Sequence, residues 1–265
     1  MEDEKIMRAI ETNPLIIKNI PHPTEEMKRL AVTRNGLVLE YLHNVTKEME
    51  ELAIKQNTRA IKFIEDPTEA MMIKAVKAGW SMLQYIKYPT DQVVELAISQ
   101  SGWAIQYVKN PSEAFQILAV KKNYDAIKYI KMPSERVQEV AVKISYEALR
   151  YIDSPTLYIE LIAIKESEAA IHFITNLDQL KIMEFLKINI LVIKYVASRI
   201  SKDELEIVLK EVLGSEEVEE KYVRDFLNCG TIERNEFVID KVMFIDQYGS
   251  KKAKKIAVDE RLKMI

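Results

Sequence analysis

Residues 110–132 read NPSEAFQILAVKKNYDAIKYIKM and contain one complete copy of a repeat that fills most of this 265-residue chain. The repeat has a period of 22 residues. The period is clearest in a recurring proline, found at Pro23, Pro67, Pro89, Pro111, Pro133 and Pro155. A constant period of this length is typical of a solenoid built from small identical units.

The proline position, which Val45 and Leu177 fill in two copies, is followed by a residue that can begin a helix. The following position holds Thr24, Thr46, Thr68, Thr90, Ser112, Ser134, Thr156 and Asp178. Their side-chain oxygens can accept hydrogen bonds from free N–H groups of the first helical turn. Seven residues later a small residue recurs, at Ala31, Ala53, Ala75, Ala97, Ala119, Ala141 and Ala163. A small residue kept at one helical position indicates that another helix passes close to it.

A second apolar pattern completes each copy. It begins after a row of residues that either end one helix in a left-handed turn or cap the next: Asn35, Asn57, Gly79, Ser101, Asn123, Ser145, Ser167 and Asn189. The pattern itself has the form Leu39-x-Tyr41-Leu42. The copy at 110–132 therefore predicts two short helices, over about 112–122 and 124–131. Helices this short are marginal alone and require stacking on neighbouring copies.

Composition excludes several other classes of protein. The chain is 48% hydrophobic and 30% charged, which allows a large core, and its net charge is −3. With only 6 glycines and with a proline in most copies, neither a β-solenoid nor a coiled coil fits. No run reaches the ~18 apolar residues of a membrane span, and the acidic start does not resemble a signal peptide. We expect a soluble, cytoplasmic protein.

The copies change at both ends of the array. Residues 1–22 are a degenerate first copy, seven clear copies follow, and 176–197 keeps the spacing without the proline and the alanine. Beyond this the period is lost. A capping box at Ser201 and Glu204 predicts a helix ended by Gly214, and Ser215 is expected to cap a second helix reaching about Asn228. Two further helices are expected over about 231–247 and 250–263.

These patterns predict an all-α protein. We expect a right-handed α-solenoid of short two-helix repeats over residues 1–198, similar in logic to HEAT repeats, and a helical cap over 199–265 that covers the open end.

Two groups of side chains are candidates for binding a partner. The first is an edge of aromatic residues and nearby lysines: Trp80, Trp103, Tyr124, Tyr146, Lys77, Lys121, Lys122 and Lys143. Large aromatics beside cations suit a protein-binding hot spot. The alternative is that each ring covers the turn of the next copy. Gly36 and Gly102 share the position of Trp80, so the fold does not require bulk there.

The second group is a basic strip that could bind nucleic acid or an acidic partner. It comprises Lys62, Lys128, Arg150, Lys165, Lys187 and Lys194. The alternative is that lysines near helix ends offset the helix dipole and keep the surface soluble. One lysine per repeat, ~8–10 Å apart, is sparse beside duplex phosphates, which recur every ~1.7 Å of axis.

The sequence gives no indication of an enzyme. The residues His22, His43 and His172 form no metal motif, and there is no phosphate-binding glycine loop or nucleophile elbow. We expect no metal, cofactor or catalytic residue, although an enzyme site in the C-terminal helices is kept as an unfavoured alternative. The single cysteine, Cys229, is interpreted as a packed thiol. The Tyr/Phe row from Tyr41 to Tyr195 is interpreted as a ladder in the core.

The repeat resembles a known but uncharacterised one. The residues of the pattern Pro-Ser/Thr-Glu…Leu-Ala-Val-Lys-x-Asn-x-x-Ala-Ile-x-Tyr-Ile-Lys, as in 111–131, resemble short helical repeats in proteins of bacteriophages and large DNA viruses. The resemblance covers about residues 22–197 and implies an α-solenoid of viral origin, without catalytic residues. It favours a protein-binding scaffold in the cytoplasm of a host cell, where it would modulate or inhibit a host defence protein. A nucleic-acid-binding solenoid is the alternative.

Overall fold

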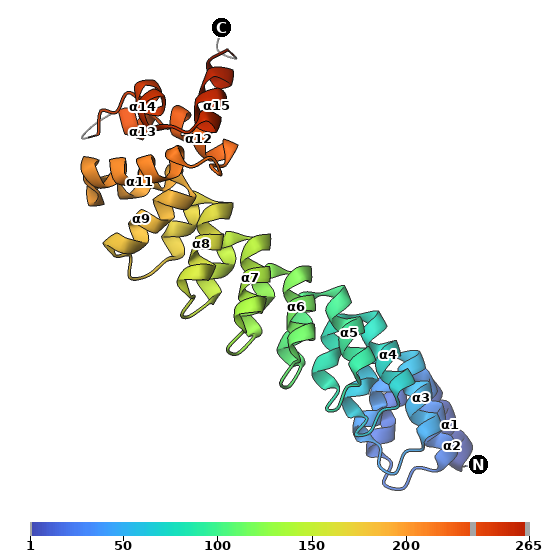
Figure 1. Cartoon of the computed structure of the whole chain (residues 1–265). Coiled ribbons are helices and arrows are strands. Elements are labelled where there is room, and N and C mark those ends of the chain that lie inside the picture. Colours follow the sequence, from blue (N-terminus) through green and yellow to red (C-terminus); the bar gives the residue numbers. More distant parts are fainter. Residues whose placement is uncertain (1, 234–236, 263–265) are drawn as a thin grey trace. The chain divides into compact units, whose positions relative to one another are not determined.

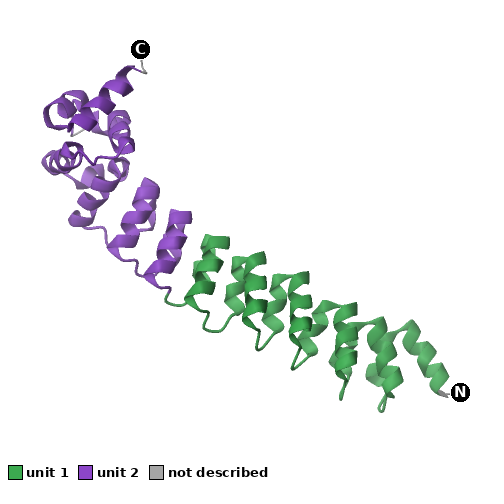
Figure 2. Ribbon diagram, turned by 45° about the vertical axis from the view of Figure 1, so that its right-hand side comes forward, with its two compact units in different colours: residues 1–132 green, residues 133–265 purple. Residues whose placement is uncertain are grey.

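A computed structural model describes residues 2–233 and 237–262, and these residues contain helices and no strands. They divide into two compact units, Met1–Met132 and Pro133–Ile265 (Figure 2). The boundary lies inside the repeat array, between two copies. Figure 1 shows the stacked helix pairs of each unit.

The first unit consists of six copies, each an α-helix followed by a shorter η (3₁₀) helix. Its elements are α1 (Glu2–Thr12), η1 (Pro14–Asn19), α2 (Glu25–Arg34), η2 (Gly36–Tyr41), α3 (Lys47–Gln56), η3 (Thr58–Phe63), α4 (Glu69–Ala78), η4 (Trp80–Tyr85), α5 (Asp91–Gln100), η5 (Gly102–Tyr107), α6 (Glu113–Lys122) and η6 (Tyr124–Tyr129). Each α-helix contacts the next one along the chain. The all-α solenoid predicted from the 22-residue period is therefore confirmed.

The second unit continues the array and then departs from it. Its elements are α7 (Glu135–Ile144), η7 (Tyr146–Tyr151), α8 (Leu157–Glu166), η8 (Glu168–Phe173), α9 (Gln179–Ile188), η9 (Ile190–Val192), α10 (Ile193–Val196), η10 (Ala197–Arg199), α11 (Lys202–Gly214), α12 (Glu220–Asn228), α13 (Gly230–Glu233), α14 (Lys241–Tyr248) and α15 (Lys251–Leu262).

Small and branched residues at fixed positions form the core of every copy. The recurring alanines, from Ala31 to Ala163, are fully buried, and so are most of the branched residues that follow them, such as Val32 and Ile98. At Gly36 the approach of the next copy is closer still, because an added Cβ would lie 2.4 Å from the carbonyl oxygen of Ala53. Stacking of copies on one another thus supplies the burial that a short isolated helix lacks.

The row of Ser, Thr and Asp after the prolines caps the α-helices, with one exception. The side chain of Thr24 accepts from the N–H of Met27 at 3.2 Å. The same hydrogen bond, to the N–H three residues ahead, is accepted by Thr46, Thr68, Ser112, Ser134, Thr156 and Asp178. Thr90 makes no capping bond, and its hydroxyl instead donates to Glu69 in the previous copy.

The second helix of each copy differs from the prediction. From η1 to η8 it is a six-residue 3₁₀ helix, 124–129 in the copy at 110–132, and in the last copy the three-residue η9 continues as α10. 3₁₀ segments of this length are uncommon. Here two adjacent side chains and the C-cap are buried in several copies, such as Ala60, Ile61 and Ile64, so packing holds the tight winding in place.

Of the two roles predicted for the row from Asn35 to Asn189, these residues cap the next helix in most copies and form no left-handed turn. Asn35 and Asn57 are extended and accept from the N–H two residues ahead, so they begin the 3₁₀ helix. The left-handed residues lie in the loops between copies instead, at Asn44, Asn110, Met132 and Asn176. In each of these loops the chain reverses direction between the end of a 3₁₀ helix and the N-cap of the next α-helix.

The C-terminal helices follow the sequence pattern only in part. The capping box of Ser201 and Glu204 begins α11 as predicted, and Gly214 ends it. Ser215 caps no helix, because the chain runs on as a turn and α12 begins only at Glu220. Of the helix expected over 231–247, residues 234–236 lie outside the described residues, and residues 238–240 are not helical. Val238 has a positive φ of 41°, which no helix accommodates.

Candidate functional site

The first aromatic position of the 3₁₀ helices packs on the next copy. The ring of Trp80 stacks on Tyr107 with centroids 6.1 Å apart and planes 27° apart. Tyr146, in the second unit, contacts Phe173 at the same centroid distance. Both rings are half-buried. These contacts agree with the alternative interpretation, in which the ring covers the neighbouring copy, and they leave less of Trp80 and Tyr146 available to a partner.

Trp103 is more exposed and lies in a polar cluster. Its side chain is 38% exposed, and its indole N–H donates to Asp125 Oδ1 at 2.8 Å. Lys128 Nζ lies 3.0 Å from Asp125 Oδ2 and 5.5 Å from the centre of the Trp103 ring. The same ammonium lies 5.0 Å from the ring of Tyr129. We call Trp103, Asp125, Lys128 and Tyr129 the Trp103 cluster.

The charge of Asp125 is stabilised inside this cluster. Burial acts to raise the pKa of Asp125, but the hydrogen bonds from Trp103 and Lys128 outweigh it and lower the pKa below its ordinary value. The carboxylate therefore stays ionised at neutral pH and fixes the orientation of the indole ring. Asp125 was not among the residues expected at the site, because a single acid inside a repeat gives no spacing signal.

The lysines of the predicted partner edge do not share one environment. In the first unit, Lys77, Lys121 and Lys122 are exposed and form no ion pair with any described residue. Lys143, in the second unit, pairs with Glu139 at 2.6 Å, and this hydrogen bond raises the pKa of Lys143. Tyr124, in the first unit, is half-buried.

Most of the predicted basic strip is neutralised by carboxylates. Lys165 contacts Glu219 at 2.6 Å, and Lys187 lies between Glu184 and Glu211 at 3.1 and 3.0 Å. Hydrogen bonds to Glu211 and Glu184 raise the pKa of Lys187.

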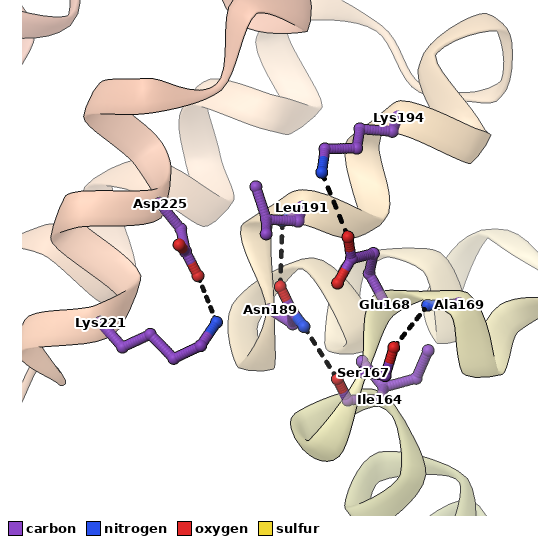
Figure 3. Close-up of polar contacts among 9 residues, drawn as sticks. All are labelled: Ile164, Ser167, Glu168, Ala169, Asn189, Leu191, Lys194, Lys221 and Asp225. Atoms are coloured by element: carbon purple, nitrogen blue, oxygen red, sulfur yellow. Dashed lines mark hydrogen bonds and ion pairs between the residues drawn. The ribbon is translucent and has the colours of Figure 1, made fainter.

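Other polar contacts of the second unit join one copy to the next. Lys194 pairs with Glu168 of the previous copy at 3.1 Å (Figure 3). In the same view Asn189 donates to the carbonyl of Ile164 at 2.9 Å and accepts from the N–H of Leu191. Lys194 and Asn189 therefore join neighbouring copies to one another.

Two residues of the strip contact aromatic rings instead of acids. Lys62 Nζ lies 4.4 Å from the ring centre of Phe63, and the Arg150 guanidinium lies 4.7 Å from that of Phe173. Neither forms an ion pair with the residues described here. The strip is thus a mixture of paired lysines and cations held over rings, and it is not a uniform row of charge.

The Tyr/Phe ladder is not in the core, contrary to the sequence-based interpretation. Tyr41, Tyr85, Tyr129 and Tyr195 are 41%, 41%, 39% and 42% exposed. The buried positions of the 3₁₀ helices are the residue two before the ladder ring and the one after it, such as Leu39 and Leu42. With three residues per turn, the ring between them points away from the core. The ladder therefore forms a surface row of half-exposed rings.

A groove that the sequence did not suggest lies between neighbouring loops of the first unit. It has a volume of about 690 Å³. It is lined by Tyr85, Lys87, Pro89, Val94, Tyr107, Lys109, Pro111 and Phe115, among others. We call it the loop groove. A smaller groove of about 500 Å³ occurs three copies earlier, lined by the corresponding residues Pro23, Lys28, Tyr41 and Asn44.

The two grooves are lined by residues at the same repeat positions. The groove therefore arises from the repeat itself. The signal that could have revealed it is a row of basic loop residues, Lys87, Lys109 and Lys131, spaced by one period.

The remaining ionisable side chains include those that could ligate a metal ion. Within residues 2–233 and 237–262, no three or more His, Cys, Asp or Glu side chains lie together as a metal site. Cys229 is a buried free thiol. His172 packs edge-on against Tyr195 with centroids 4.8 Å apart. In the same residues no helix has the length and apolar character needed to cross a membrane.

Fold and surface together define the class of protein: an α-solenoid of 22-residue repeats with half-exposed aromatic rings on its 3₁₀ helices. Comparison with protein-family models, curated proteins and solved structures finds no match.

Proposed function

We propose that this chain is a non-enzymatic protein-binding scaffold that uses the 3₁₀ helices of its first unit. The observation that carries the proposal is the row of half-exposed rings at Tyr41, Tyr85, Trp103 and Tyr129, each close to 40% exposed. Rows of large exposed apolar side chains are uncommon on surfaces without a partner. Tyr and Trp are also the residues that contribute most at protein interfaces.

The Trp103 cluster is the strongest part of this surface. Its indole ring is held by Asp125 and flanked by Lys128, so a partner would meet it already oriented. A fixed ring loses little conformational entropy on binding, which favours affinity. The exposed lysines Lys121 and Lys122 at the end of α6 add positive charge to the same copy.

The identity of the partner is proposed from the resemblance of the repeat. Because the repeat resembles those of bacteriophages and large DNA viruses, we propose that the partner is a host protein in the bacterial cytoplasm. Binding would modulate or inhibit that protein, and a defence protein is the class most consistent with such an origin.

Capture from a bacterial lysate tests this function. Full-length protein carrying an affinity tag should retain a specific protein that mass spectrometry identifies. The double variant Trp103→Ala, Tyr129→Ala should lose most of that protein. Its matched control is Ile207→Ala, Met243→Ala, which removes two exposed apolar side chains outside the repeats, 56% and 70% exposed. Equal capture by both variants would contradict the proposed surface.

A nucleic-acid-binding solenoid is a second candidate, supported by cations that lie over aromatic rings. Lys62, Lys128 and Arg150 each do so. Proteins that bind single strands combine basic side chains with stacking rings. Against it, Lys165, Lys187 and Lys194 are already paired with carboxylates, so these residues, half of the predicted basic strip, are engaged within the protein.

A further inference from the structure

One side chain makes the loop groove larger than its counterpart beside α2. Val94 occupies the repeat position that holds Lys28 in the second copy and Gln116 in the sixth. Lys28 donates to the carbonyl of His43 at 3.1 Å, and Gln116 donates to that of Pro111 at 2.9 Å. These longer side chains reach back to a loop and occupy part of the space beside it. Valine is shorter and has no donor, so more of the space beside α5 stays open.

The walls of the groove are aromatic. Tyr85 and Tyr107 come from consecutive 3₁₀ helices, and Phe115 comes from the first turn of α6. At the rim, Tyr88 is 72% exposed with Lys87 Nζ 5.1 Å from its ring centre. A volume of about 690 Å³ lies within the range of sites that bury a ligand group of several carbon atoms. The groove can therefore accept one large apolar side chain.

The rim of the groove is positive. Lys87 and Lys109 are exposed, line the groove and form no ion pair with any described residue. The only acid in the lining is Asp91. The corresponding loop position holds His43 and Glu65 in earlier copies, so this positive rim is specific to the copies around the groove.

We propose that the loop groove binds an extended acidic segment of a partner protein. An aromatic or aliphatic side chain of the segment enters between Tyr85 and Tyr107 beside Val94. Carboxylates on either side of it pair with Lys87 and Lys109. The proposal rests on the protein-binding function above and adds the chemistry of the partner and a second contact surface.

Selection from a display library of random dodecapeptides on the full-length protein tests the groove. The enriched peptides should be acidic and should share one aromatic or aliphatic position. Fluorescence anisotropy with the best synthetic peptide then gives its Kd for each variant. Lys87→Glu, Lys109→Glu should raise that Kd about tenfold or more, as expected when charges at a rim are reversed. Val94→Met introduces the residue that another copy has at this repeat position, Met72. It should raise the Kd because the longer side chain fills the groove.

Two controls keep the result specific. Lys55→Glu, Lys74→Glu reverses the same number of charges on α3 and α4, outside the groove lining, and should leave the Kd within about twofold. If Val94→Met lowers the melting temperature, the lysine variant alone decides, because both lysines are exposed.

The proposal is overturned by enriched peptides without acidic residues, by a Kd unchanged in the lysine variant, or by no enrichment at all. Binding of a single-stranded oligonucleotide in place of peptides would overturn it, as would a dimer that the lysine variant dissociates. Lysate capture that survives both groove variants would refute the groove and leave the protein-binding function standing.

Discussion

At the scale of single residues, one repeat position controls how closely two copies approach. Gly36 and Gly102 occupy it in two copies, and a Cβ there would lie 2.4 and 2.2 Å from the carbonyl oxygens of Ala53 and Ala119. Such distances are far shorter than any normal contact. Trp80 occupies the same position in another copy, so the backbones cannot approach in the same way there.

Alanine at these glycines should destabilise the protein. We expect Gly36→Ala or Gly102→Ala to lower the free energy of unfolding by about 1–3 kcal/mol, because the added methyl group forces two copies apart. Urea denaturation followed by far-ultraviolet circular dichroism measures this. Gly79→Ala is the matched control: its backbone is extended and a Cβ would meet nothing within 4 Å. A similar loss in all three variants would show that the close approach is unimportant.

Met132 has a strained backbone conformation. It has φ 50°, whereas the residues with a similar φ at the same repeat position are asparagines, Asn44, Asn110 and Asn176. A left-handed conformation costs most residues ~1–2 kcal/mol, and asparagine less. The Met132 side chain is 95% exposed, so its removal loses no packing.

Met132→Asn should therefore raise the stability by about 0.5–1 kcal/mol, visible as a higher melting temperature. Ser154→Asn is the control, because Ser154 has the same repeat position without a positive φ. A gain of equal size in the control would point to a cause other than backbone conformation.

At the scale of elements, the C-terminal helices are joined to the last copies by a buried hydrogen bond. The hydroxyl of Tyr222 in α12 donates to the carbonyl of Leu186 in α9 at 2.9 Å, and the residue is 5% exposed. Burial raises the pKa of Tyr222 above its ordinary value, so the hydroxyl remains a donor at all ordinary pH values.

Tyr222→Phe should lower the free energy of unfolding by about 1–3 kcal/mol, the cost of leaving a buried carbonyl without its donor. Calorimetry of the full chain measures the effect. Tyr195→Phe removes a hydroxyl from a ladder ring that is 42% exposed and should change little. If the two variants melt alike, the hydrogen bond does not hold α12 in place.

At the scale of the whole molecule, stability comes from contacts between sequence neighbours. Within each unit an α-helix contacts the α-helix of the adjacent copy, so the array behaves as a chain of weak units coupled to their neighbours. Ion pairs also link neighbouring elements, since Lys194 and Lys187 pair with acids of an adjacent element or copy. The net charge is only −3.

A gel-shift titration of the full chain distinguishes the two proposed functions. Because most of the basic strip is paired, we expect no shift of single-stranded or duplex DNA or RNA even at about 50 mM salt. Binding that falls steeply between about 50 and 200 mM salt would require ~6–10 phosphate contacts. Such a result would favour the nucleic-acid alternative over the protein-binding scaffold.

The sequence by itself determined the fold class, the copies and the α-helical caps, because these depend on local signals that recur every 22 residues. It could not determine that the second helix is a 3₁₀ helix or that the Tyr/Phe ladder faces outward. One apolar pattern fits both windings, and only packing against neighbouring copies decides between them.

Tertiary structure alone decided the candidate sites. The Trp103 cluster joins Trp103 to Asp125 across two copies, and the loop groove is larger where Val94 is shorter than its counterparts. Both depend on which side chains from different copies meet in space. A period in the sequence gives the spacing of such side chains along the chain, but contact and empty volume exist only once the copies are stacked.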